Sequence, residues 1–259
     1  MRSATIRTQL EMELADRYPS PFSTPQMPST ETMPTGIEEV DRLIGGLPRG
    51  RITEIFGQDS SGRTSLMLSI LTQITDNKEV CGLIDSAATF DPASATDFGI
   101  DLERLLWIRT GRDLDKTLKV TDLLLQGGGF GLIGIDLGAI PIAEILRVPL
   151  STWFRLQRAA ENTPTILLFI NQQTCIKTCA SLALRMGLEH TDWSPNSFRG
   201  IHSRAEIVRS RTDPAAAWSG VDACYRLESI GYRRAVSPVQ VISPPPQGIG
   251  IQGVSRHEH

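Results

Sequence analysis

Short apolar runs alternate with amphipathic stretches through the middle of the chain. Apolar runs of strand length lie at residues 51–57, 79–85, 105–110, 131–136 and 165–171. Apolar residues with helical spacing lie between them, at residues 64–74, 114–126 and 151–161. Continuous apolar strands that alternate with helices are typical of a parallel sheet covered by helices on both faces. The pattern therefore predicts an α/β core with a mostly parallel central sheet.

The pattern changes after residue 180. Three strand-like segments follow one another with no helical pattern between them, at residues 181–189, 204–211 and 222–229. Strands that are consecutive along the chain commonly pair in an antiparallel arrangement. We therefore expect an antiparallel C-terminal extension of the same sheet.

The two ends of the chain differ in composition from this core. Ile6, Leu10 and Leu14 recur at helical spacing, and a stretch rich in proline, serine and threonine follows them. The last residues contain three consecutive prolines and show no helical period. The helix either packs on its own core or serves as a handle for a neighbouring subunit or partner. We expect four parts: an amphipathic helix at residues 1–18, a linker at 19–34, a core at 35–235 and a flexible tail at 236–259.

A short helix is expected where the core begins. Thr35 and Glu38 have the spacing of a capping box, in which two side chains satisfy backbone N–H groups of the first helical turn. Gly45 and Gly46 then supply a helix stop.

Composition places the chain among ordinary globular proteins. Its 259 residues are 40% hydrophobic and 21% charged, with a formal net charge of −3. No apolar run reaches the roughly 18 residues needed to cross a bilayer, and no export signal is visible at the start. We expect a cytoplasmic protein with no membrane partner. Because the chain is mildly acidic, contact with nucleic acid would need a local basic patch.

The four cysteines are Cys81, Cys175, Cys179 and Cys224. They are too few and too scattered for a disulfide framework, so reduced thiols are expected. Cys175 and Cys179 have one alternative interpretation, as half of a metal site.

Residues 57–65, GQDSSGRTS, form the clearest chemical motif. Their spacing is that of a phosphate-binding loop, and they lie between a predicted strand and a predicted helix. Backbone N–H groups in such a loop, together with the helix N-terminus, hold phosphate oxygens. The candidate nucleotide-binding residues of this loop are Gly57, Ser60, Ser61, Gly62, Arg63, Thr64 and Ser65.

Thr64 and Asp136 are the candidate ligands of Mg²⁺, because such sites combine a hydroxyl after the loop with a carboxylate at the end of an apolar strand. The motif departs from the usual pattern at Arg63, where a phosphate loop normally carries lysine. A guanidinium is larger, planar and forked, so it cannot sit beside the phosphates as an ammonium does. We therefore expect ATP and Mg²⁺ to bind weakly or not at all.

Four segments, in the same order and at similar spacing, resemble the ATPase core of the bacterial RecA recombinases. They read TGIEEVDRLIGGLPRGRITEIFGQDSSGRTSL, GLIDSAATFDPASATDFGIDLERLLW, LIGID and LLFINQQ. The similarity spans residues 35–235. It implies a RecA-like P-loop core, in a family that exchanges DNA strands as an ATP-dependent filament.

The resemblance also implies roles for single residues. Asp91 matches an adenine-contacting aspartate, and Gln172 matches a glutamine that reports the γ-phosphate to a DNA-binding loop. Arg209 and Arg211 fall where the family has two lysines that reach the nucleotide of the adjacent subunit. These two arginines alternate along a predicted strand and so share one face. Their alternative role is to protect a solvated strand edge by charge.

Several positions depart from the family pattern. The catalytic glutamate corresponds to Ala87, and the aromatic residue that stacks on adenine corresponds to Ser94. A carboxylate that activates the attacking water contributes about 10²–10⁴ in rate, which alanine cannot supply. Asp85 is the nearest replacement. The chain also has too few residues after Gln172 and after Asp136 for the long DNA-binding loops of the family.

This pattern of losses resembles the ImuA type of RecA-like protein, an accessory of error-prone repair synthesis. The resemblance implies a role in DNA repair and the SOS response. It implies error-prone polymerase machinery or a RecA-type filament as partner, with single-stranded DNA as a candidate ligand. Two other hypotheses stay open: an active DNA-dependent ATPase and recombinase, and a nucleotide-gated regulator that does not bind DNA.

Overall fold

Eight strands form the central sheet of the computed structural model, which describes residues 31–195, 197–211 and 222–228. Their order across the sheet is β10-β9-β8-β3-β7-β6-β4-β5. The pairs among β3 to β8 are parallel, whereas β9 pairs antiparallel with β8 and β10. The predicted α/β class, with its antiparallel C-terminal extension, is confirmed. The strands are β3 (Ile52–Gly57), β4 (Val80–Asp85), β5 (Leu105–Arg109), β6 (Phe130–Asp136), β7 (Ile166–Asn171), β8 (Leu182–Ser194), β9 (Ser197–Ser210) and β10 (Asp222–Glu228).

Three predicted parts of the chain lie outside the described residues. They are the N-terminal helix at residues 1–18, most of the linker at 19–34, and the tail at 236–259.

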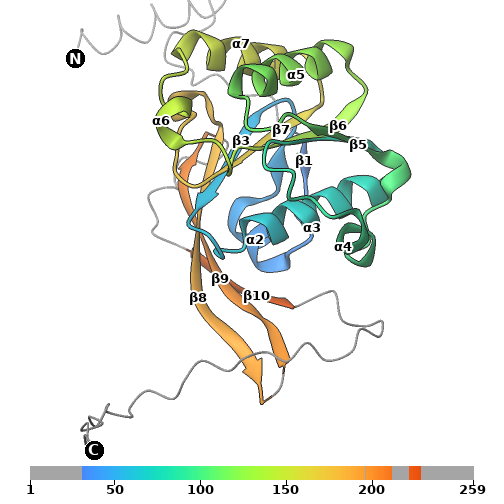
Figure 1. Cartoon of the computed structure of the whole chain (residues 1–259), viewed down its shortest axis with the longest axis vertical. Coiled ribbons are helices and arrows are strands. Elements are labelled where there is room, and N and C mark those ends of the chain that lie inside the picture. Colours follow the sequence, from blue (N-terminus) through green and yellow to red (C-terminus); the bar gives the residue numbers. More distant parts are fainter. Residues whose placement is uncertain (1–30, 196, 212–221, 229–259) are drawn as a thin grey trace, which may run out of the picture.

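Helices cover both faces of the sheet, with the strands between them (Figure 1). Side chains alternate between two apolar cores along the central parallel strands, so that Leu132 of β6 faces one core and Ile133 faces the other. The first core lies under α2 (Glu38–Ile44), α3 (Arg63–Asp76) and α4 (Pro92–Asp97). The second lies under α5 (Leu114–Gly127), α6 (Ile142–Ile145) and α7 (Leu150–Glu161). The described part of the chain also has two short 3₁₀ turns, η1 (Leu102–Arg104) and η2 (Lys177–Cys179).

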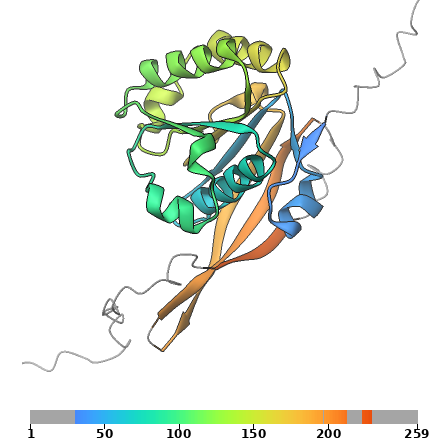
Figure 2. The ribbon, with the colours of Figure 1, turned by 90° about the vertical axis from the view of Figure 1, so that its right-hand side faces the viewer.

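The strands β8 and β9 continue past the core as a long hairpin (Figure 2). Ion pairs join its strands to each other and to β10, as between Arg185 and Glu206 at 2.5 Å and between Arg226 and Asp192 at 2.7 Å. The hairpin leaves the core beside the phosphate loop, because Met186 of β8 pairs with Gly57, the last residue of β3.

A small two-stranded sheet precedes the first helix. Its strands are β1 (Thr32–Met33) and β2 (Leu47–Pro48), which pair antiparallel. The side chain of Met33 is buried in the core beneath α3. The predicted linker therefore ends too late in the sequence. Met33 packs against residues that are distant in the sequence, and local composition does not reveal such contacts.

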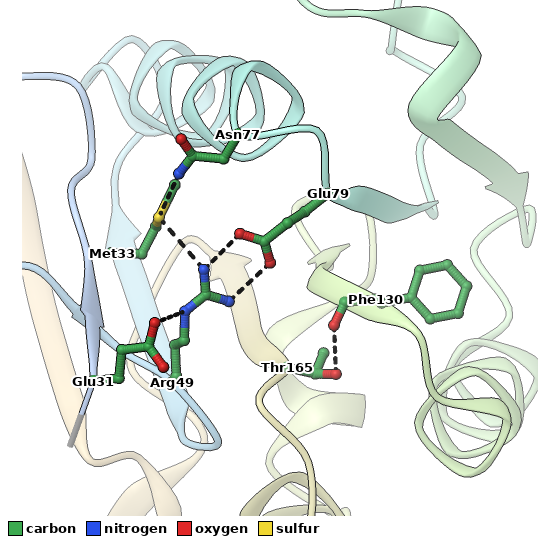
Figure 3. A network of polar contacts seen from close by, with 7 residues as sticks. All are labelled: Glu31, Met33, Arg49, Asn77, Glu79, Phe130 and Thr165. Atoms are coloured by element: carbon green, nitrogen blue, oxygen red, sulfur yellow. Dashed lines mark hydrogen bonds and ion pairs between the residues drawn. The ribbon is translucent and has the colours of Figure 1, made fainter.

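Arg49 fastens this small sheet to the main one (Figure 3). Its guanidinium donates to both carboxylate oxygens of Glu79, at 2.6 and 2.9 Å, and lies 3.6 Å from the carboxylate of Glu31. Such a bidentate ion pair fixes the orientation of the guanidinium as well as its distance from the carboxylate. The segment that leads into the core is thus held against the turn that precedes β4.

The start of α2 differs from the prediction. The carboxylate of Asp41 accepts hydrogen bonds from the backbone N–H groups of Thr35 and Gly36, at 2.6 and 3.3 Å. The prediction of a capping box formed by Thr35 and Glu38 is wrong, because the carboxylate of Asp41, about one turn further along the helix, accepts from these N–H groups. The predicted stop is confirmed, since Gly45 ends the helix with a left-handed φ of 70°.

Candidate nucleotide-binding site

The phosphate loop joins β3 to α3, as the sequence predicts. Gly57 is the last residue of β3, and Gly62 precedes α3 with a φ of 88°. Within the loop, Ser60 also has a left-handed φ of 63°, and the N–H of Ser61 donates to the carbonyl oxygen of Gln58 at 3.2 Å. These turns bend the chain back on itself at the carboxyl end of β3.

Gly57 is required at its position by the neighbouring strand β8. A Cβ atom on Gly57 would lie 2.3 Å from the carbonyl oxygen of Met186 and 2.8 Å from Oγ of Ser61. The Met186 carbonyl belongs to the paired backbone of β8, so it cannot move aside cheaply. The close packing of the loop against β8 therefore explains the first glycine of the motif.

The N-terminus of α3 opens toward this loop. Backbone N–H groups in the first helical turn have no acceptor within the helix, and they carry a partial positive charge. Thr64 lies exposed in this turn, and Ser65 is half-buried beside it. The buried Oγ of Ser61 has no hydrogen-bond partner within the described part of the chain. The backbone of the loop fits the phosphate groups of a nucleotide.

Arg63 points its guanidinium at protein acceptors. Nη2 donates to the carboxylate of Asp59 at 3.0 Å, and Nη1 donates to the backbone carbonyl oxygen of Asn171. The side chain is only 11% exposed. The guanidinium of Arg63 is the single cation of the loop, and each of its two Nη atoms already donates a hydrogen bond to the protein.

Asp136 lies at the carboxyl end of β6, and Gln172 follows β7 next to it. An Asp136 carboxylate oxygen accepts from the N–H of Gly138 at 2.8 Å, and Nε2 of Gln172 lies 3.5 Å from the carbonyl oxygen of Gly138. The strands β3, β7 and β6 are neighbours, so the loop, Gln172 and Asp136 share one edge of the sheet. Ligands of open α/β sheets bind at this edge.

Burial raises the pKa of the Asp136 carboxyl above its ordinary value. The N–H of Gly138 acts in the opposite direction, because it stabilises the charged form. The negative charge of Asp85 raises the pKa further, and the positive charge of Arg63 lowers it. Arg63 and Asp85 therefore both act electrostatically on the Asp136 carboxyl.

Asp85 cannot serve as the missing catalytic carboxylate. One of its oxygens accepts from the backbone N–H groups of Ala87 and Thr89, at 3.0 and 3.3 Å. The other accepts from the N–H of Phe90 at 3.0 Å and from Nε1 of Trp107 at 3.3 Å. The prediction that Asp85 is the nearest replacement is therefore wrong, because this buried carboxylate is committed to four donors that shape the turn after β4.

Asp91 caps the helix α4. Its carboxylate accepts from the N–H of Ser94 at 2.9 Å and from Oγ of Ser94 at 2.5 Å. The hydrogen bond from the Ser94 hydroxyl, with that from the backbone, holds the pKa of the Asp91 carboxyl below its ordinary value. Ser94 stands at the position of the family's aromatic residue. It thus hydrogen-bonds to the Asp91 carboxylate, which the resemblance assigns to adenine.

Arg209 and Arg211 lie at the end of the sheet opposite to the phosphate loop. Arg209 pairs with Ala183 of β8, and the N–H of Arg211 donates to the carbonyl oxygen of Ser181, level with the start of β3. The length of β3 separates them from the loop by roughly 15 Å. They do not contact the phosphate loop of their own chain, and contact with a neighbour's nucleotide stays a prediction.

The two arginines lie on the same side of the sheet, around Cys179. Burial raises the pKa of the Cys179 thiol, and the positive charges of Arg211 and Arg209 lower it. Nη2 of Arg211 donates to the carbonyl oxygen of Thr178, while the buried Nη1 of Arg209 has no partner among the described residues.

Glu54 is a site residue that the sequence analysis missed. It is fully buried in the middle of β3. Its carboxylate accepts from Nδ2 of Asn171 at 3.1 Å, from Oγ1 of Thr174 at 2.8 Å, and from the N–H groups of Cys175 and Ile176 at 2.6 and 3.1 Å. A charged residue inside an otherwise apolar strand was the available signal. Glu54 fixes the short turn after β7 that replaces a long loop.

Cys175 and Cys179 are both buried and free. Burial raises the pKa of the Cys175 thiol, and the nearby negative charge of Glu54 raises it further. No group of three or more His, Cys, Asp and Glu residues in the described ranges has a metal-binding arrangement, so the half-site interpretation gains no further ligand.

The geometry defines a RecA-like P-loop domain, and comparison with known proteins agrees. Residues 22–147 match the RecA N-terminal domain family. Two curated proteins named Protein RecA, from Bartonella quintana (strain Toulouse) and Bartonella henselae, are each 38% identical over 124 residues. This region is 46% of the chain and 35% of either relative. Residues 22–147 are thus similar to the RecA N-terminal domain, and the similarity to these RecA proteins is distant.

The chain spans about a third of the length of the curated relatives it matches. The matched region includes the phosphate loop and Asp136 but ends before Gln172, Arg209 and Arg211. No helix in the described part of the chain is long and apolar enough to cross a membrane.

Proposed function

We propose that this protein is an accessory of DNA repair or damage-induced mutagenesis that acts in the cytoplasm and does not hydrolyse ATP. One observation carries the proposal: among the described residues, no free carboxylate stands at the position from which water would be activated. Ala87 stands where the resemblance implies the catalytic glutamate, and Asp85 is bonded to four N–H donors. Without a general base the in-line attack of water loses about 10²–10⁴ in rate.

A weakly bound nucleotide is compatible with the residues that remain. The backbone of residues 57–65 would hold the phosphates, and Thr64 and Asp136 would hold Mg²⁺. When bound, Mg²⁺ would neutralise charge on the phosphate oxygens. Weak binding is expected because Arg63, the only cation of the loop, already donates to Asp59 and Asn171.

The proposed role is carried out through other macromolecules. The turn after β7 is short and is held in place by Glu54, so it cannot extend along DNA as a long flexible loop would. We propose an error-prone polymerase assembly of the ImuA type, or a RecA filament, as the partner. Co-sedimentation with RecA filaments on single-stranded DNA tests the second partner, and a protein that stays in the supernatant speaks against it.

Steady-state ATP turnover tests the proposal directly. We expect turnover by the wild-type protein to equal the buffer background, with or without single-stranded DNA, because no residue in the site activates water. The measurement is phosphate release at saturating ATP and Mg²⁺. Hydrolysis that DNA stimulates and that disappears in Asp136→Ala would establish the active recombinase instead.

The third hypothesis, a regulator that does not bind DNA, predicts a different result. A gel shift with single-stranded DNA that weakens as salt increases would exclude it, because neutralised phosphates release counterions.

A further inference from the structure

We propose that Arg63 is a latch that competes with nucleotide phosphates: its guanidinium ties the phosphate loop to the end of β7, and this tie must open before a nucleoside di- or triphosphate binds. The inference rests on the proposed function, since it concerns the same site. It adds a regulatory role to a residue that the motif alone presents as a defective lysine.

The first step is the position of the two acceptors. Arg63 begins α3, Asp59 lies four residues earlier in the loop, and Asn171 is the last residue of β7. The guanidinium therefore bridges two separate elements at the carboxyl edge of the sheet. A lysine ammonium is a single point charge on a flexible stem and lacks the planar fork that contacts two acceptors in fixed directions.

The second step is the rigidity of the anchor. The side chain of Asn171 is held by Glu54 at 3.1 Å and lies 2.9 Å from Sγ of Cys175, and all three side chains are buried. The Asn171 carbonyl is thus a fixed acceptor at the base of the site. Because both acceptors of Arg63 belong to the same chain, a phosphate must displace partners that are already in place.

The third step is the charge of the site. Arg63 is the only cationic residue in the loop sequence GQDSSGRTS. Its charge is balanced by Asp59, and it also acts on the buried Asp136. An incoming phosphate therefore meets a cation that the Asp59 carboxylate and the Asn171 carbonyl oxygen already engage, and it binds only when Arg63 changes partners.

The latch has a consequence for communication across the site. Gln172 directly follows the residue whose carbonyl Arg63 holds. When a nucleotide phosphate displaces Arg63 from the Asn171 carbonyl, the end of β7 loses a restraint. Any nucleotide that carries a phosphate chain would have this effect. The strand end would thus respond to ADP as well as to ATP.

The test is nucleotide affinity of the full chain, measured with a fluorescent ADP analogue and Mg²⁺ by polarisation, with folding verified by circular dichroism. We expect Asp59→Asn to bind about fivefold more tightly than wild type, because the loss of this partially exposed pair favours opening. Asp115→Asn, which removes the same charge from an exposed position on α5, is the matched control and should not change affinity. Equal affinities of the two variants would overturn the latch.

A double-mutant cycle separates the latch from simple repulsion between Asp59 and phosphate. In an Arg63→Met background, Asp59 has no guanidinium to hold, so we expect its replacement by Asn to change affinity by less than about twofold. A gain that stays near fivefold in this background would overturn the latch. Absence of nucleotide binding in every variant would also overturn it, yet would leave the proposed lack of hydrolysis intact.

Discussion

Replacement of Glu54 by alanine is expected to lower the free energy of unfolding by about 4 kcal/mol, because four buried donors lose their acceptor. The carboxylate accepts from the Asn171 and Thr174 side chains and from the N–H groups of Cys175 and Ile176. Each buried donor left without a partner costs about 1–3 kcal/mol, and structural relaxation recovers part of the total. Urea unfolding followed by circular dichroism measures the change.

Two variants make this prediction specific. Glu54→Gln keeps the shape and one acceptor oxygen but turns an amide NH₂ toward other donors, so we expect a loss of about half that size. Glu144→Ala removes an exposed glutamate at α6 and should change the unfolding free energy by less than about 0.5 kcal/mol. If Glu54→Ala proves as mild as Glu144→Ala, the carboxylate does not hold the turn after β7.

The second large effect concerns hydrolysis. We expect the double variant Arg63→Lys with Ala87→Glu to raise ATP turnover about 10²-fold above the wild-type background. The phosphate loop backbone and Asp136 are retained, lysine releases the Asn171 carbonyl, and the new glutamate supplies a general base. Position 94 remains a serine, which has no ring to stack on adenine, so the Michaelis constant for ATP should remain high.

Single-turnover and steady-state assays on the wild type and four variants decide this. The two single variants should stay near background, because each restores only one of the missing functions. Addition of Asp136→Ala to the double variant should abolish the gained turnover. A double variant that remains at background while it binds nucleotide would mean that the site has lost more than a cation and a base.

The sequence predicted the elements around the site because local signals specify them. Apolar runs located β3, β6 and β7, and the spacing of Gly57 and Gly62 located the loop between strand and helix. Two of the failures involve partners that are distant in sequence. Met33 packs beneath α3, and Asp85 is held by Trp107 of the next strand.

The sequence by itself determined the class of fold, the phosphate loop and the absence of a glutamate at position 87, because periodicity and residue identity are local properties. Only the tertiary structure decided what the remaining side chains do. It joined Arg63 to Asn171, more than a hundred residues away, and it committed Asp85 and Glu54 to backbone donors. Hydrogen bonds depend on where the fold brings donors and acceptors together, which no stretch of sequence specifies alone.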